Sequence, residues 1–210
     1  MSTRLPAGDP RTEVSAALPF VPYRPEGRAE VPQPLSEFAA RGLHAIATGA
    51  AAGVKSARCA LAMLGDDGET AAARFADLLA ASGVVADAHA AYELARSLDE
   101  AGRMADATVV LAVLSGTEAG QAAGMLGLAV LSTRQGRMDV AGDLVAACLE
   151  TSDRHPRALS LAGIGELQRG DRQAAHAYLA MASRIARRHP DYRAELQIAQ
   201  RALLLMHLAQ

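Results

Sequence analysis

Six histidines and two cysteines are the side chains of this sequence best suited to hold a metal ion. The histidines are His44, His89, His155, His176, His189 and His207. No two of them have the HxxxH or HExxH spacing that brings two imidazoles to one face of a helix. Cys59 and Cys148 lie far apart and form no CxxC pair, so burial as small apolar side chains is favoured over a disulfide or a metal site. The sequence predicts no metal and no cofactor.

Motifs that support catalysis are missing as well. There is no GxGxxG opening a helix after a strand, no GxxxxGK[ST] loop and no Gly-x-Ser-x-Gly elbow. The glycines of Gly163-Ile164-Gly165 fall in the middle of an expected helix and indicate close helix packing. Acidic neighbours such as Asp99 and Glu100 fall at an expected helix end, where solvated charges are usual. The sequence predicts no enzymatic activity.

Charge and composition point to a helical protein without a strong electric field. The 21 Lys and Arg nearly balance the 23 Asp and Glu, which gives a net charge of −2 and no attraction for nucleic acid or an anionic membrane. Only 3% of residues are aromatic and much of the apolar fraction is alanine, which favours packed helices over strands. No apolar run approaches the ~20 residues that cross a bilayer, and no secretory signal is recognisable. We expect an all-α cytoplasmic protein without membrane insertion.

Proline divides the chain into two parts. Seven of the nine prolines lie within residues 1–34, and a segment so rich in proline cannot build its own core. We predict an extended or disordered tail at residues 1–34 and one helical repeat domain at residues 35–210. Within that domain only Pro156 and Pro190 remain, and both fall where a break between helices is expected.

A period of 34 residues is the strongest signal in the sequence. Glycines recur at this spacing, at Gly68, Gly102, Gly136 and Gly170. Five residues after each glycine stands an alanine, namely Ala73, Ala107, Ala141 and Ala175. A glycine lets the chain leave a helix in a left-handed turn, and an alanine lets two helices approach closely.

The period and these small residues resemble the tetratricopeptide repeat, a helix–turn–helix unit of about 34 residues. The family's next bulky and small positions are filled by Leu111 with Leu114, Val145 with Cys148, and Leu179 with Ala182. In the first unit they are Asp77 and Ala80, and the family's aromatic positions are absent throughout. The resemblance covers residues 54–190 and implies a right-handed superhelix of three to four helical hairpins.

This repeat pattern predicts the positions of the helices. We expect hairpins at 54–66 with 69–82, 86–101 with 104–116, 120–135 with 138–151, and 157–169 with 172–188. A helix at 36–50 is expected to cap the front of the array and one at 191–208 to cap its back, because the ends of a repeat stack need covering.

In this family the first helix of each pair lines a concave face that takes an extended peptide. The resemblance implies that the predicted binding face is formed by His89, Tyr92, Arg96, Asp99, Leu126, Val130, Thr133, Arg134, Ser160, Ile164 and Gln168. Its apolar middle and polar edges suit a short hydrophobic peptide. Tyr92 and Arg96 are the strongest candidates, because a Tyr–Arg pair needs no burial. For Leu126 and Val130, packing between repeats is an equal alternative. The subclass that binds acidic chaperone tails is disfavoured, because its lysines are missing.

Two further features each have a structural and a functional interpretation. Leu203-Leu204-Leu205-Met206 surrounds most of a helical turn, so the last helix is either a fuller terminal cap or a contact for a homodimer or partner. Arg184, Arg187, Arg188 and His189 end a helix, where cations complement the helix dipole; a basic partner site is the alternative.

The stretches Leu126–Gly136 and Arg157–Gly170 resemble the small tetratricopeptide chaperones of bacterial type III secretion, which keep a secreted subunit soluble in the cytoplasm. The resemblance implies a protein or extended-peptide partner. The alternative is a scaffold that assembles a pilus, flagellar or envelope machine, and a regulator of an enzyme or transcription factor is a third class. The Pro19–Pro25 segment suggests that the tail occupies a binding groove until cargo displaces it, against a simple disordered leader.

Overall fold

The computed structural model describes residues 58, 61, 64–65, 68–82, 87–151 and 155–208. Every regular element in these ranges is helical, which confirms the all-α class for this part of the chain. The predicted tail at 1–34, the predicted helix at 36–50 and Cys59 lie outside the described residues. The chain divides into two compact units, one ending at Thr151 and the other running from Ser152 to Gln210, and each is described here by itself.

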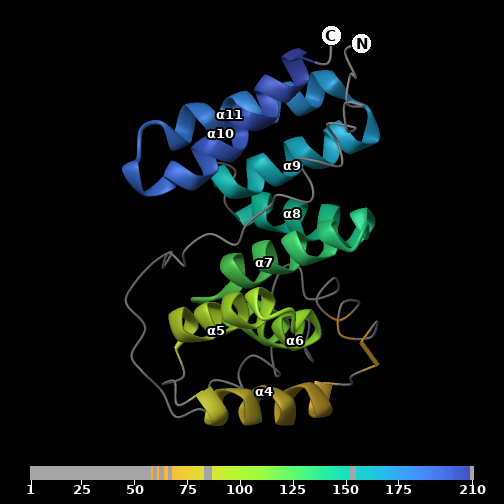
Figure 1. Cartoon of the computed structure of the whole chain (residues 1–210), viewed down its shortest axis with the longest axis vertical. Helices are drawn as coiled ribbons and strands as arrows, with labels where there is room; N and C mark the ends of the chain where they lie inside the picture. The colour runs from red at the N-terminus through yellow and green to blue at the C-terminus, as the bar shows by residue number, and fades with distance from the viewer. Residues whose placement is uncertain are drawn as a thin grey trace, which may run out of the picture. The chain divides into compact units, whose positions relative to one another are not determined.

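From α4 onward, the helix bounds agree with the predicted bounds to within two residues, whereas most of the predicted helix at 54–66 lies outside the described residues. The first unit contains α4 (Gly68–Ser82), α5 (Ala88–Glu100), α6 (Met104–Ser115), α7 (Gln121–Arg134) and α8 (Met138–Thr151). The second contains α9 (Pro156–Arg169), α10 (Arg172–Ala186), the 3-10 turn η1 (Pro190–Tyr192) and α11 (Arg193–Leu208) (Figure 1). Both late prolines begin an element, as expected for residues that cannot continue the helix before them.

The turn inside each of three hairpins is the same Schellman motif. Gly102, Gly136 and Gly170 have φ of +75°, +74° and +89°. In each case the glycine N–H donates to the carbonyl three residues back, and the next N–H donates to the carbonyl five residues back. These bonds satisfy the last carbonyls of the helix, and the left-handed φ explains why glycine stands there. The alanines five residues later, Ala107, Ala141 and Ala175, are all buried.

The predicted register of the first hairpin is wrong. Gly68 begins α4, and the left-handed glycine is Gly65 with φ +74°, which lies 37 residues before Gly102. The fourth residue of α4 is therefore Ala71 and the eighth is Phe75, and both are 0% exposed.

Ala73, Asp77 and Ala80, which the 34-residue phase assigned to the packing positions of this helix, are exposed. Like the equivalent helices of the later repeats, α4 packs a small residue followed by a bulky one. The connection that leads into α4 is longer than in those repeats. The first repeat therefore matched the family pattern poorly because its register is shifted.

Helix α6 is the centre of the first unit. It packs against α4, α5 and α7, and α7 in turn packs against α8 (Figure 1). From Ala107 to Leu114 only Thr108 is more than 0% exposed, which explains why this helix is apolar all round. The close approach of α6 and α7 depends on Gly124, where a Cβ would lie 2.5 Å from the Ser115 nitrogen and 2.8 Å from the Leu111 oxygen.

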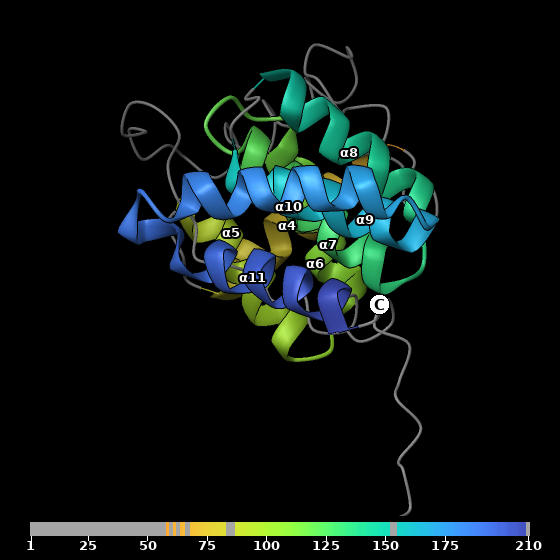
Figure 2. The same ribbon diagram turned by 90° about the horizontal axis from the view of Figure 1, so that it is seen from above.

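In the second unit, α9, α10 and α11 lie side by side (Figures 1 and 2). A Cβ at Gly163 on α9 would meet the Leu179 side chain at 2.6 Å and the Ala175 oxygen at 3.1 Å, so the close packing expected of this glycine is present. Arg172 at the start of α10 donates to the backbone carbonyl of Met206 near the end of α11. That bond ties the last helix to the hairpin.

Helix α11 covers the α9–α10 hairpin with one face, which contains Glu195, Ala199, Ala202 and Met206. Of the four consecutive apolar residues, only Met206 is buried, and Leu204 is 57% exposed. One packing face therefore does not hide them all. The helix caps the hairpin within its own unit, and a homodimer through its outer face stays a prediction.

Candidate functional site

The α5 part of the predicted binding face is only partly at the surface. His89 is exposed, but Tyr92 is 5% exposed and belongs to the core. The expectation that Tyr92 stands at the surface beside Arg96 is therefore wrong. The spacing of one helical turn correctly placed the two side chains near one another on the helix. That spacing does not show whether other parts of the chain cover Tyr92.

Arg96 and Asp99 are engaged in ion pairs. Arg96 lies 2.8 Å from Glu93 and 2.6 Å from Glu100 on its own helix, and the hydrogen bond to Glu93 is the main reason that its pKa is raised. Asp99 accepts a hydrogen bond from Arg134 of α7 at 2.6 Å. This pair joins the first helices of two successive hairpins, 35 residues apart, so part of the predicted face is held together by its own charges.

The α7 part of the predicted face is buried. Leu126 and Val130 are 6% and 1% exposed, which agrees with the alternative that they pack within the repeat stack. Thr133 is also buried, and its hydroxyl donates to the Ala129 carbonyl at 2.8 Å. A peptide-binding role for these side chains stays a prediction, and it requires that whatever covers them moves aside.

The α9 part lies in the other unit. Ser160 is fully buried, with its hydroxyl bonded to the Pro156 carbonyl at 2.9 Å, and Ile164 is 1% exposed. Gln168 is half-buried, and its side-chain oxygen is buried without a hydrogen-bond partner in the part of the chain that the structure describes. Within the first unit the structure brings Asp99 and Arg134 together, and within the second Ser160, Ile164 and Gln168 share helix α9.

An ion-pair cluster, which the sequence did not reveal, joins α4 to α6. The carboxylate of Asp106 accepts hydrogen bonds from Arg74 of α4 and from Arg103 at 2.8 Å. Burial raises the pKa of Asp106, but the hydrogen bonds and charges of the two guanidinium groups outweigh it and hold the pKa below its usual range. The cluster stabilises the contact between two helices.

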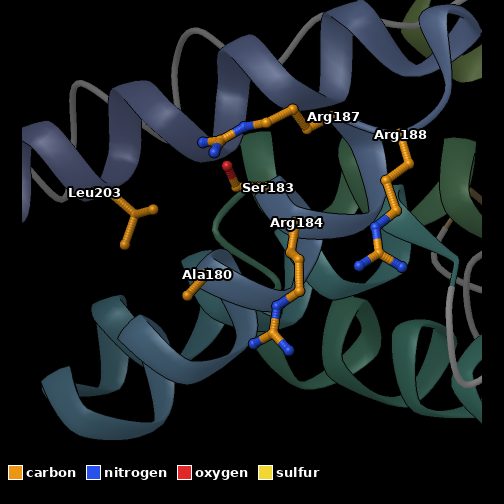
Figure 3. A pocket seen from close by; sticks show the side chains of 6 residues that line it. All are labelled: Ala180, Ser183, Arg184, Arg187, Arg188 and Leu203. Carbon is orange, nitrogen blue, oxygen red and sulfur yellow. The ribbon is translucent and has the colours of Figure 1, made fainter.

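An open cavity of the second unit lies between α10 and α11. It has a volume of about 440 Å³ and is lined by Ala180, Ser183, Arg184, Arg187, Arg188 and Leu203. We call it the arginine pocket. Figure 3 shows Arg184 and Arg188 extending in roughly the same direction from α10, while Arg187 reaches past Ser183 toward the helix that carries Leu203. Three cations thus lie beside the apolar side chains of Ala180 and Leu203.

These arginines differ from five others in the described part of the chain. Arg74, Arg96, Arg103, Arg134 and Arg169 each pair with a carboxylate. Arg184, Arg187 and Arg188 are exposed and make no ion pair with the described residues. The sequence explains this contrast, because no acidic residue occurs between Asp171 and Asp191. The three arginines of the pocket can therefore bind an anionic group.

The sequence identified the arginines of this pocket as a candidate basic site but did not predict the residue of α11 that completes its lining. Cations at a helix end are visible in the sequence, as is Ala180 one turn before Arg184, but Leu203 joins them only because α11 packs back on α10. In the residues that the structure describes, no three His, Cys, Asp or Glu side chains are grouped to hold a metal ion. No helix there has the length and apolarity needed to cross a membrane.

Comparison of the chain with protein-family models, with curated proteins and with solved structures gave no significant match.

Proposed function

We propose that this chain is a tetratricopeptide-type helical repeat protein that binds a polypeptide partner, and that it acts as a cytoplasmic chaperone for a secreted bacterial subunit. The observation that carries the proposal is the recurrence of one turn. Gly102, Gly136 and Gly170 lie 34 residues apart with the same left-handed φ and the same pair of hydrogen bonds. Equivalent turns at a fixed period are what a stack of helical hairpins requires, and such stacks present extended surfaces to other chains.

Contacts between successive hairpins of the first unit support stacking. Arg74 of α4 pairs with Asp106 of α6, and Asp99 of α5 pairs with Arg134 of α7. The sequence separations of these pairs, 32 and 35 residues, are close to one repeat. Residues one repeat apart come into contact when equivalent helices lie beside one another. The chaperone role itself rests on the resemblance of the sequence to the type III secretion chaperones.

The scaffold is the second candidate function, and one observation favours it. Tyr92, Leu126 and Val130, which a groove-binding chaperone would use, are buried in this structure. A protein that assembles a larger complex through its outer surfaces does not need this face to open. The two functions therefore differ in which surface touches the partner.

Capture of partners from the native cell lysate, identified by mass spectrometry, tests the proposal. The variant His89→Ala/Arg96→Ala alters the two predicted face residues that reach the surface of α5, and it spares the buried Tyr92. His176→Ala/Arg193→Ala is the matched control, because it removes the same residue types from exposed positions of the second unit.

A chaperone is expected to capture one dominant secreted subunit in a fixed stoichiometry, to keep it soluble on co-expression, and to lose it in the first variant only. Several partners that both variants retain would support the scaffold. Recovery of no protein above an empty-tag control would contradict both.

A further inference from the structure

We infer that the arginine pocket is the docking site for an acidic segment of the partner polypeptide, with carboxylates over Arg184 and Arg188 and an apolar side chain against Leu203 and Ala180. This inference rests on the proposed function, because it names the chemistry of the partner that the repeat protein holds. It adds a second contact surface, on the α10–α11 hairpin, to the predicted binding face.

Uncompensated positive charge is concentrated at the end of α10. Three arginines occur within five residues, and no carboxylate of the described chain pairs with them. Arg184 lies in the last turn of α10, and Arg187 and Arg188 follow directly after the helix ends at Ala186, where all three are exposed. The C-terminus of a helix carries roughly half a negative charge, which three cations exceed. An anionic partner neutralises this excess.

The shape of the site suits a side chain that is partly apolar. The cavity of about 440 Å³ has apolar side chains, Ala180 and Leu203, beside its guanidinium groups. Met181 is 41% exposed and lies three residues before Arg184, on the same side of α10. Methionine adapts its shape to varied apolar partners. A peptide that alternates carboxylates with a leucine-sized side chain matches this arrangement in both charge and polarity.

The lining of the pocket distinguishes between classes of anion. Guanidinium groups bind carboxylate and phosphate alike, so charge alone does not separate a peptide from a nucleic acid or a lipid. Nucleic-acid sites of this size combine cations with aromatic stacking platforms, and the pocket has no aromatic lining residue. A membrane surface needs a broad basic and apolar face, whereas the apolar lining here consists of two side chains, Ala180 and Leu203. The geometry favours an acidic peptide.

Fluorescence anisotropy with the full chain tests the site. The probe is a fluorescein-labelled peptide of sequence EELEELEE. Its controls are QQLQQLQQ, which lacks the charges, and EEAEEAEE, which lacks the leucines. The variant Arg184→Gln/Arg188→Gln removes two pocket cations. Arg193→Gln/Arg201→Gln removes two exposed arginines of the same unit that do not line the pocket, and it is the matched control.

Wild-type chain is expected to bind EELEELEE and to bind both control peptides more weakly. The pocket variant should lose about tenfold in affinity, as removal of two surface charge interactions allows, and the matched control variant less than about twofold. Both variants should keep the thermal midpoint of the wild type, because the substituted side chains are exposed.

Three results would overturn the inference: equal binding of the glutamate and glutamine peptides, unchanged affinity in the pocket variant, or tighter binding of an anionic phosphatidylglycerol vesicle or a single-stranded oligonucleotide that depends on the same arginines. Lysate capture separates this failure from failure of the proposed function. A partner that wild type and the pocket variant capture equally well contradicts the site alone, whereas no capture by wild type contradicts the proposed function.

Discussion

Asp106 is the side chain whose charge contributes most clearly to the contact between helices of the first unit. Its carboxylate is largely shielded from solvent, whereas its partners Arg74 and Arg103 are 41% and 55% exposed in their side chains. Loss of the carboxylate therefore leaves no buried cation without a partner. The cost of such a loss is the hydrogen bonds themselves, and not the desolvation of what remains.

We predict that Asp106→Asn lowers the free energy of unfolding by about 1 kcal/mol at neutral pH, as loss of a charged hydrogen-bond network at a half-solvated site allows. The folded pKa of Asp106 lies below its usual value, so the stabilisation is present above the unfolded pKa and is lost as the pH falls through the folded one. The difference between wild type and variant should close below about pH 4. Thermal unfolding measured from pH 7 down to pH 2 checks this. A stability difference between wild type and Asp106→Asn that does not change with pH would contradict this prediction. Asp143→Asn, at an exposed position, is the control.

Burial is the residue property that the sequence predicted least well. The spacing of Tyr92, Leu126 and Val130 placed them on helices α5 and α7, as the structure has them. Whether such a face is open depends on the residues that pack over it from elsewhere in the chain, and a 34-residue period carries no information on that. Ala107, Ala141 and Ala175 were predicted correctly at packing positions, because their small size has one physical use there, whereas Ala73 is exposed because the first repeat is shifted in register.

At the scale of the helix, the bounds could be read from the sequence because each hairpin carries its own stop signal. A left-handed glycine ends the first helix, and Pro156 begins α9 at its first residue. The register of the first hairpin could not be read. Gly65 and Gly68 lie three residues apart, and Gly68 matches the period by its number alone. Only the backbone conformation shows that Gly65 makes the turn.

Alanine substitution at these two glycines tests the corrected register. Gly65→Ala should destabilise the first unit by about 1 kcal/mol, because φ of +74° is unfavourable for a residue with a Cβ even though no atom lies within 4 Å of it. Gly68→Ala should be neutral or slightly stabilising, since the residue is helical and alanine is the better helix former. Urea unfolding of both variants gives the comparison. The reverse order of stability would restore the 34-residue phase.

Two glycines of α9 provide a sharper test of helix packing. A Cβ at Gly163 would collide with Leu179 at 2.6 Å, so Gly163→Ala should destabilise the second unit by about 1–3 kcal/mol. At Gly165 the nearest atom is the Arg169 side chain at 3.9 Å, so Gly165→Ala should stabilise it by about 0.5–1 kcal/mol. Both substitutions add one methyl group to the same helix. Thermal unfolding followed by circular dichroism separates packing from helix propensity, and equal effects at the two sites would show that α9 and α10 are not in close contact.

At the scale of the whole molecule, the charge is unevenly distributed along the chain. The net charge is −2, yet residues 172–208 contain six arginines against two carboxylates, Asp191 and Glu195. Glu195 is 1% exposed, so it contributes little to the surface of the hairpin that it belongs to. The overall field repels an acidic ligand while the arginine pocket attracts it. These two effects act over different distances, and salt distinguishes them.

Salt dependence of the binding of EELEELEE measures which effect governs the affinity. Raising the ionic strength from about 0.1 M to about 1 M shortens the Debye length from about 10 Å to about 3 Å, which weakens both long-range repulsion and local attraction at an exposed site. If the pocket dominates, wild-type affinity should fall as salt rises. In Arg184→Gln/Arg188→Gln, where the local cations are removed and the chain is two charges more negative, the affinity should be flat or should rise. An affinity that rises with salt in the wild type would mean that the peptide is held by apolar contacts against the overall field, and that the arginines take no part in binding it.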